Sequence, residues 1–223
     1  MKKFLSLLLA VIMAFSVFAV VPTTAGASAE TDRIIAQIKS AYSKSLSLSG
    51  RSSFNGYCGA YVRYQAMALD IISESDSDVR GDGNKIYGNI TKGTTSKGYT
   101  KTKYSGNNCI NNIVNSNSGN VYNIIVSWTY EYGASVGSPG AGHATFIHAI
   151  INGVVYFSES YATRGIPEGG VHTCSISEFY SRYNSSYGNA IGAVHFTKAD
   201  PPTDKPGNHI PLQTRVYIHT EKA

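Results

Sequence analysis

A helix that begins at a cysteine is the feature of this sequence that most constrains its fold. After Gly56, which allows a tight turn, the residues expected to face the core recur every three or four positions: Tyr61, Val62, Gln65, Ala66, Leu69 and Ile72. This spacing places Cys58 in the first helical turn, where free N–H groups and the helix dipole stabilise a thiolate. The alternative is a core cysteine, because free cysteine is among the most buried residue types.

Residues 1–29 have the pattern of a secretory signal peptide. Lys2 and Lys3 precede an apolar run over residues 4–21, and the small residues Ala27-Ser28-Ala29 form an A-x-A cleavage site. Pro22 and the small residues disfavour the alternative, a retained membrane anchor. We therefore expect a secreted, extracellular protein, possibly associated with the cell wall, that has no membrane span after cleavage.

The rest of the chain is long enough for one domain with its own core, expected over residues 30–198. Residues 199–223 begin with a proline-rich stretch and are expected to form a linker or tail. The formal charge of the whole chain is +5, which suits an anionic partner such as a Gram-positive bacterial wall. Lysine and arginine form no concentrated run, so nucleic acid is not expected as a partner. The sequence gives no prediction of the oligomeric state.

The pattern of elements predicts an α+β domain, with helices first and antiparallel strands later. Helices are expected over residues 31–42, 58–73 and 107–117, and after the capping box Ser175-Ile176-Ser177-Glu178. Strands are expected over residues 121–130, 143–150, 154–160 and 190–197.

Two polar stretches are expected to lack regular structure, residues 43–53 and residues 76–102. Residues 76–84 partly match a calcium-binding loop, but Arg80 occupies a ligand position and Tyr87 stands where the twelfth-position glutamate belongs. The chain also lacks CxxC and HxxxH spacings. We therefore predict no metal and no cofactor.

A base and an orienting group follow Cys58 in the sequence. His143 lies in Gly-His-Ala-Thr-Phe-Ile, and Glu159 lies in Val-Val-Tyr-Phe-Ser-Glu-Ser. With Gly-Tyr-Cys-Gly-Ala-Tyr around Cys58, this order resembles the papain-like bacterial hydrolases, above all the CHAP family of cysteine, histidine-dependent amidohydrolases/peptidases. The resemblance covers about residues 54–196. It implies a papain-like fold in which Cys58 is the nucleophile, His143 the base and Glu159 the orienting residue.

The sequence departs from the family pattern at two positions. Tyr161 stands where members often carry an asparagine, which leaves a fourth site residue unassigned. Tyr57 stands where a glutamine helps to form the oxyanion hole. The side chain of Asn55 and the backbone N–H of Cys58 are the substitutes that the sequence offers.

Strand geometry tests which histidine can reach Glu159. His143 and His148 are five residues apart, so their side chains point to opposite faces of a strand. A two-residue turn at Asn152-Gly153 places Glu159 on the face of His148, whereas a three-residue loop places it on the face of His143. The family pattern favours His143.

Three cysteines lie outside the leader, in what would be an oxidising compartment. If Cys58 is the working thiol, Cys109 and Cys174 remain to form a disulfide. The alternative, a disulfide between Cys58 and one of the other two, would remove the nucleophile.

The resemblance implies hydrolysis of amide bonds in peptidoglycan peptides, by an amidase or endopeptidase. One alternative is an extracellular cysteine peptidase that acts on proteins or peptides. The other is a catalytically inactive wall-binding or adhesion module that keeps the fold without a reactive Cys58.

Overall fold

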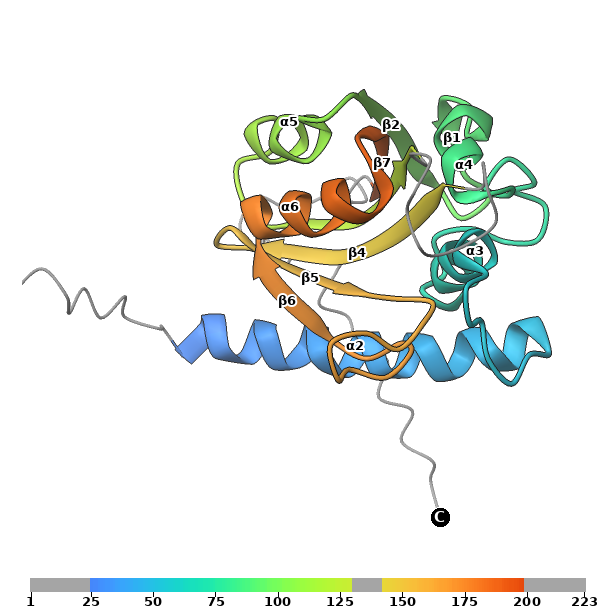
Figure 1. The fold of residues 1–223 in the computed structure, drawn as a ribbon, viewed down its shortest axis with the longest axis horizontal. Helices are drawn as coiled ribbons and strands as arrows, with labels where there is room; N and C mark the ends of the chain where they lie inside the picture. Colours follow the sequence, from blue (N-terminus) through green and yellow to red (C-terminus); the bar gives the residue numbers. More distant parts are fainter. Residues whose placement is uncertain (1–24, 130–141, 199–223) are drawn as a thin grey trace, which may run out of the picture. The chain divides into compact units, whose positions relative to one another are not determined.

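A sheet of seven antiparallel strands, in the order β1-β2-β7-β3-β4-β5-β6, carries the α+β fold in this computed structural model (Figure 1). The structure describes residues 25–129 and 142–198. The strands are β1 (Gly93–Thr94), β2 (Tyr99–Ser105), β3 (Val121–Trp128), β4 (His143–Ile151), β5 (Val154–Ser158), β6 (His172–Ser175) and β7 (Ala190–Lys198). The described helices are α2 (Ala25–Ser49), α3 (Cys58–Ala68), α4 (Gly83–Asn89), α5 (Cys109–Asn115) and α6 (Ile176–Tyr187).

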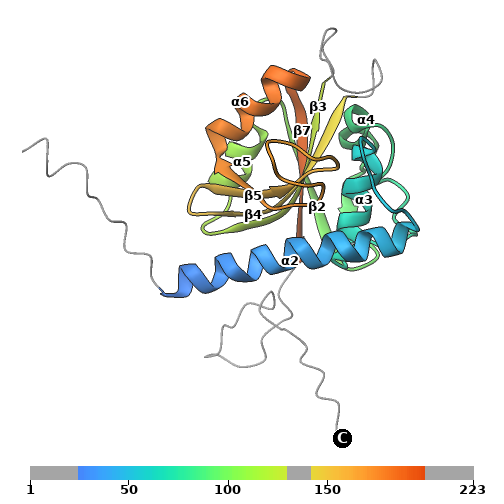
Figure 2. The same ribbon diagram turned by 60° about the horizontal axis from the view of Figure 1, so that its bottom comes forward.

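Helices cover both faces of the sheet, as Figure 2 shows. On one face, α3 and α4 pack against Ile125 of β3, Phe146 of β4 and Val194 of β7. On the other face, α5 and α6 pack against alternate residues of the same strands, such as Ile124 and Ile147. The central strands are therefore buried on both sides, which explains their nearly continuous apolar sequences.

The helix α2 is longer than the sequence analysis predicts, because it continues through the polar residues 43–49. Tyr42 and Leu46 pack against the α3 side of the core. The buried Ser45 accepts a hydrogen bond of 3.1 Å from Gln65 in α3. The helix ends at Ser49, and the following Gly50 has a φ of 63°, a left-handed conformation that glycine adopts at little cost.

The chain divides into two units, residues 1–33 and residues 34–223. In the described part of the first unit, Arg33 forms a two-pronged ion pair with Glu30 at 2.7 and 2.8 Å. Most of the predicted leader, residues 1–24, lies outside the described residues. The predicted tail, residues 199–223, also lies outside them. Along the part of the chain that is described, no helix is long and apolar enough to cross a membrane.

The prediction that the polar residues 76–102 lack regular structure is wrong. These residues contain α4, β1 and the beginning of β2. The strand β2 pairs with β7 along its whole length. Lys101 of β2 is buried, and its ammonium group pairs with Asp78 at 2.7 Å. The sequence conceals this strand because an ion pair, rather than an apolar side chain, fills that core position.

The expected disulfide between Cys109 and Cys174 is not supported, because all three cysteines are free. Cys109 begins α5 and its sulfur lies 3.8 Å from the hydroxyl of Tyr180 in α6. Cys174 lies in the edge strand β6, where it pairs with Val155. Both thiols lie on the same side of the sheet, but neither lies within bonding distance of the other.

Candidate active site

The candidate nucleophile, Cys58, is the first residue of α3, and only 8% of its surface is exposed. Burial raises the pKa of a thiol, because it disfavours the charged form. Here the hydrogen bond and the positive charge of His143 lower the pKa of Cys58. The backbone N–H groups of Ala144 and Gly59 add to this effect, and together these groups outweigh burial. The side chain therefore favours the thiolate form.

The imidazole of His143, the first residue of β4, lies between the thiol and a carboxylate. Its Nε2 atom lies 3.2 Å from Oε2 of Glu159, so Nδ1 is the ring nitrogen that remains for the sulfur of Cys58. Burial alone would lower the pKa of His143, but the hydrogen bonds and charges of Cys58 and Glu159 raise it to about 9. The pair is therefore arranged as a thiolate beside an imidazolium.

Glu159, the residue after β5, is 1% exposed and has three partners. Besides His143, it accepts a hydrogen bond from the hydroxyl of Tyr183. The guanidinium of Arg182 approaches its Oε1 at 3.5 Å. A buried carboxylate is stable only when it is paired in this way, so these contacts hold Glu159 in place behind the imidazole.

Three tyrosines surround the ring of His143, and the sequence analysis assigns none of them a role beside it. Tyr187 stacks on the imidazole with ring centroids 4.3 Å apart, and Tyr183 stacks at 5.6 Å. Tyr161 meets the ring edge-on at 5.8 Å. Its hydroxyl lies 2.8 Å from that of Tyr187. The spacing of Tyr183 and Tyr187, four residues apart on one face of α6, was the available sequence signal.

The pairing of β4 with β5 places Glu159 beside His143 through a two-residue turn followed by a β-bulge, a combination that the sequence does not predict. Asn152-Gly153 forms a two-residue turn, with φ values of 49° and 78° and Ile151 opposite Val154. This turn alone would place Glu159 beside His148. However, Ala149 pairs with Tyr156 and Ile147 with Phe157, so His148 is the extra residue of a β-bulge.

The prediction that a two-residue turn places Glu159 on the face of His148 is wrong, because the bulge shifts the pairing by one residue. Beyond the bulge Phe146 pairs with Ser158, so the strands continue in the register that a three-residue loop would give. His148 is fully buried, and its Nε2 lies 2.8 Å from the hydroxyl of Ser158. Burial lowers the pKa of His148 to about 3 and keeps it neutral. It belongs to the core rather than to the Cys58–His143–Glu159 cluster.

The oxyanion role of the Asn55 side chain stays a prediction, because the described contacts of this residue are those of its backbone. Asn55 is exposed, and its backbone N–H donates to Ser53 Oγ at 3.0 Å and to Glu168 at 3.3 Å. The backbone N–H of Cys58 lies at the N-terminus of α3, where N–H groups have no partner within the helix. It is therefore available as the oxyanion donor expected from the sequence.

A glycine allows α4 to touch the beginning of β4. A Cβ atom at Gly83 would lie 2.3 Å from the carbonyl carbon of His143 and 2.7 Å from the nitrogen of Ala144. Any other residue at position 83 would therefore displace the strand that carries the imidazole.

The described residues hold no group of three or more His, Cys, Asp or Glu side chains arranged to bind a metal ion. Comparisons with protein-family models, curated proteins and solved structures gave no match. A functional assignment therefore depends on the chemistry of the Cys58–His143–Glu159 cluster and on the motifs around it.

Proposed function

We propose that this protein is a secreted cysteine hydrolase with a papain-like architecture that cleaves amide bonds. One observation carries the proposal: a thiol of lowered pKa at a helix N-terminus lies beside an imidazole of raised pKa, which a buried carboxylate holds. A nucleophile, a base and an orienting group in this order are the requirements of acyl transfer through cysteine.

The reaction follows from these three side chains. The Cys58 thiolate attacks the amide carbonyl carbon, and the N–H of Cys58 stabilises the oxyanion that forms. The imidazolium of His143 gives its proton to the leaving amine as the C–N bond breaks, which leaves a thioester on Cys58. Neutral His143 then takes a proton from water, whose oxygen attacks the thioester. The carboxylic acid leaves, and the thiolate–imidazolium pair is restored.

The proposed substrate is the peptide part of bacterial peptidoglycan, in keeping with the family resemblance of the motifs around Cys58, His143 and Glu159. Without Lys2 and Lys3 of the predicted leader the formal charge is about +3, which favours approach to an anionic wall. Beside the nucleophile, Tyr57 is 60% exposed, and the guanidinium of Arg51 lies 4.6 Å from the centre of its ring. An exposed aromatic ring at this position offers a flat contact for a bound substrate.

The test compares the purified protein with its Cys58→Ala variant on isolated Gram-positive cell walls and, separately, on unfolded casein. A Cys174→Ala variant is the matched control, because it removes a thiol from an edge strand outside the cluster. Mass spectrometry identifies the released fragments. We expect the unchanged protein and Cys174→Ala to release wall peptides, and Cys58→Ala to release none.

The other outcomes separate the rival functions. Cleavage of casein alone would assign the protein to the peptidases that act on proteins. If neither substrate is cleaved while all three forms bind walls tightly, the fold serves binding and the hydrolase proposal is wrong.

A further inference from the structure

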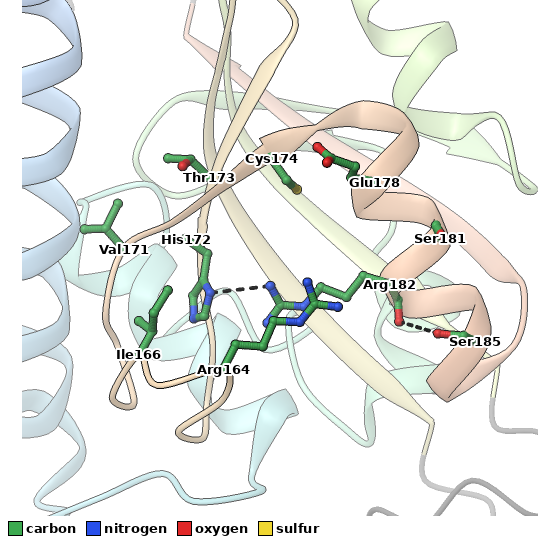
Figure 3. Close-up of a pocket in the computed structure, with 10 residues that line it drawn as sticks. All are labelled: Arg164, Ile166, Val171, His172, Thr173, Cys174, Glu178, Ser181, Arg182 and Ser185. Atoms are coloured by element: carbon green, nitrogen blue, oxygen red, sulfur yellow. Dashed lines mark hydrogen bonds between the residues drawn. The ribbon is translucent and has the colours of Figure 1, made fainter.

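A pocket of about 460 Å³ lies beside α6 (Figure 3). The loop after β5, the strand β6 and α6 contribute its walls. Its lining residues are Arg164, Ile166, Val171, His172, Thr173, Cys174, Glu178, Ser181, Arg182 and Ser185. The hydrolase proposal assigns no function to this pocket.

Arg182 presents a guanidinium whose hydrogen-bonding capacity is only partly used. Its side chain is 13% exposed, and the guanidinium carbon lies over the ring of Phe157, 5.1 Å from the ring centre. Its two described polar contacts are long, 3.4 Å to Nδ1 of His172 and 3.5 Å to Glu159. A guanidinium has five N–H donors in a rigid fork, so donors remain for a ligand in the pocket.

Arg164 brings a second positive charge to the same pocket. It lies in a turn closed by two 2.9 Å hydrogen bonds between Thr163 and Ile166, and its φ of 52° is in the left-handed region. The turn fixes the backbone from which the exposed side chain extends. Among the hydrogen bonds and ion pairs of the described residues, none engages the guanidinium of Arg164.

His172 lines the pocket beside Arg182. The residue is 2% exposed, and burial and the two arginines lower its pKa to about 4, so the ring is neutral at pH 7. Because Arg182 donates toward Nδ1, the single ring proton is on Nε2. That buried N–H has no hydrogen-bond partner among the described residues. Because that nitrogen has no exposed surface, the ring serves the pocket through its Nδ1 edge, which accepts from Arg182 and orients that guanidinium.

One carboxylate also lines the pocket, but its own contacts engage it. Glu178 accepts hydrogen bonds of 2.8 Å from both the N–H and the hydroxyl of Ser175, as the acidic residue of the capping box. Figure 3 shows Glu178 beside Cys174, away from the group formed by Arg164, Arg182 and His172. The pocket therefore has an end where positive charge and donors gather.

We propose that this pocket binds a small oxyanion, a carboxylate or a phosphate, between the guanidinium groups of Arg164 and Arg182. Two guanidinium groups match the oxygen pairs of such anions, and hydrogen bonds of this kind are the strong ones in proteins. The anion adds a second acceptor for Arg182, which otherwise contacts Glu159 alone among carboxylates. Its binding does not require that Cys58 be a nucleophile.

The test is isothermal titration calorimetry of the full chain at pH 7 and constant ionic strength, with inorganic phosphate in one arm and acetate in the other. The two arms distinguish a tetrahedral anion from a carboxylate. We expect saturable binding of at least one probe. Arg164→Gln should weaken that binding about tenfold or more, which corresponds to the loss of one charge-assisted contact.

Two control variants show whether the loss of binding is specific to the pocket. Arg51→Gln removes an exposed arginine that lies over Tyr57, outside the pocket, and should leave binding unchanged. Cys58→Ala should also bind as the unchanged protein does, which separates this proposal from the hydrolase proposal. The inference is wrong if neither probe binds saturably, or if Arg164→Gln and Arg51→Gln weaken binding equally.

Discussion

The carboxylate of Glu168 accepts a 2.5 Å hydrogen bond from the backbone N–H of Phe54, four residues before the candidate nucleophile. It also accepts one of 2.6 Å from the hydroxyl of Ser53. Nearby, the N–H of Gly56 donates to the carbonyl of Ser160 at 3.1 Å. The loop that follows β5 therefore holds the segment that leads into α3, and one loop positions both Glu159 and Cys58.

We predict that Glu168→Ala destabilises the protein by about 2–3 kcal/mol, because several donors to a charged group lose their acceptor. The alkylation rate of Cys58 should change as well, because the turn before α3 loses its anchor. Urea unfolding and iodoacetamide labelling measure the two effects. Glu74→Ala, which removes an exposed carboxylate elsewhere, is the control. Equal effects of the two substitutions would argue against an anchoring role.

The three free thiols should differ in reactivity. The pKa of Cys58 is lowered, whereas burial raises the pKa of Cys109 and raises that of Cys174 to about 11. Because the thiolate is the reactive form, iodoacetamide at pH 6–7 should label Cys58 first. Peptide mapping by mass spectrometry identifies the labelled residue. Labelling of Cys174 before Cys58 would contradict the thiolate assignment.

The two histidines of β4 should have separable roles. His143→Ala removes the positive partner of the thiolate, so the alkylation rate of Cys58 at pH 6 should fall about tenfold or more. His148→Gln keeps a nitrogen near Ser158, and the rate should stay within about twofold, since the neutral His148 has no described contact with the sulfur. If His148→Gln slowed alkylation as much as His143→Ala, the proposed base would be misassigned.

Buried neutral histidines should make the protein sensitive to mild acid. Burial lowers the pKa of His148 to about 3 and that of His195 to about 4, below the usual 6.5. The unfolded chain therefore takes up protons before the folded protein does, and stability falls as the pH drops below about 6.5. Between pH 6.5 and 4.5, His148 alone should account for a loss on the order of 2 kcal/mol.

Urea unfolding at pH 6.5 and 4.5 measures this loss, and His148→Gln should show a smaller one. Asp76 and Asp78 do not account for it, because their pKa values lie below the usual 3.8 and they stay ionised across this range. An identical loss in the variant would show that His148 is not the group that titrates.

Local patterns in the sequence predict most of the elements around the cluster. The three- and four-residue spacing after Gly56 predicts α3, and the box at Ser175 and Glu178 predicts the start of α6, where both capping hydrogen bonds form. These signals are readable because they depend on residues within one or two turns of each other. The strand β2 escapes prediction because its buried lysine is paired with Asp78, a partner distant in the sequence.

The sequence by itself determined most of the described helices and strands, though not α4, and it determined the residue types of the candidate site and the order in which Cys58, His143 and Glu159 occur. Only the tertiary structure decided that these side chains meet. The bulge at His148 sets the register that brings Glu159 to His143, and tyrosines from α6 and Glu168 hold the arrangement. The physical reason is the sequence separation of the interacting residues. Helical periodicity and helix caps depend on residues a few positions apart, whereas a one-residue shift in strand pairing depends on how segments distant in the sequence pack.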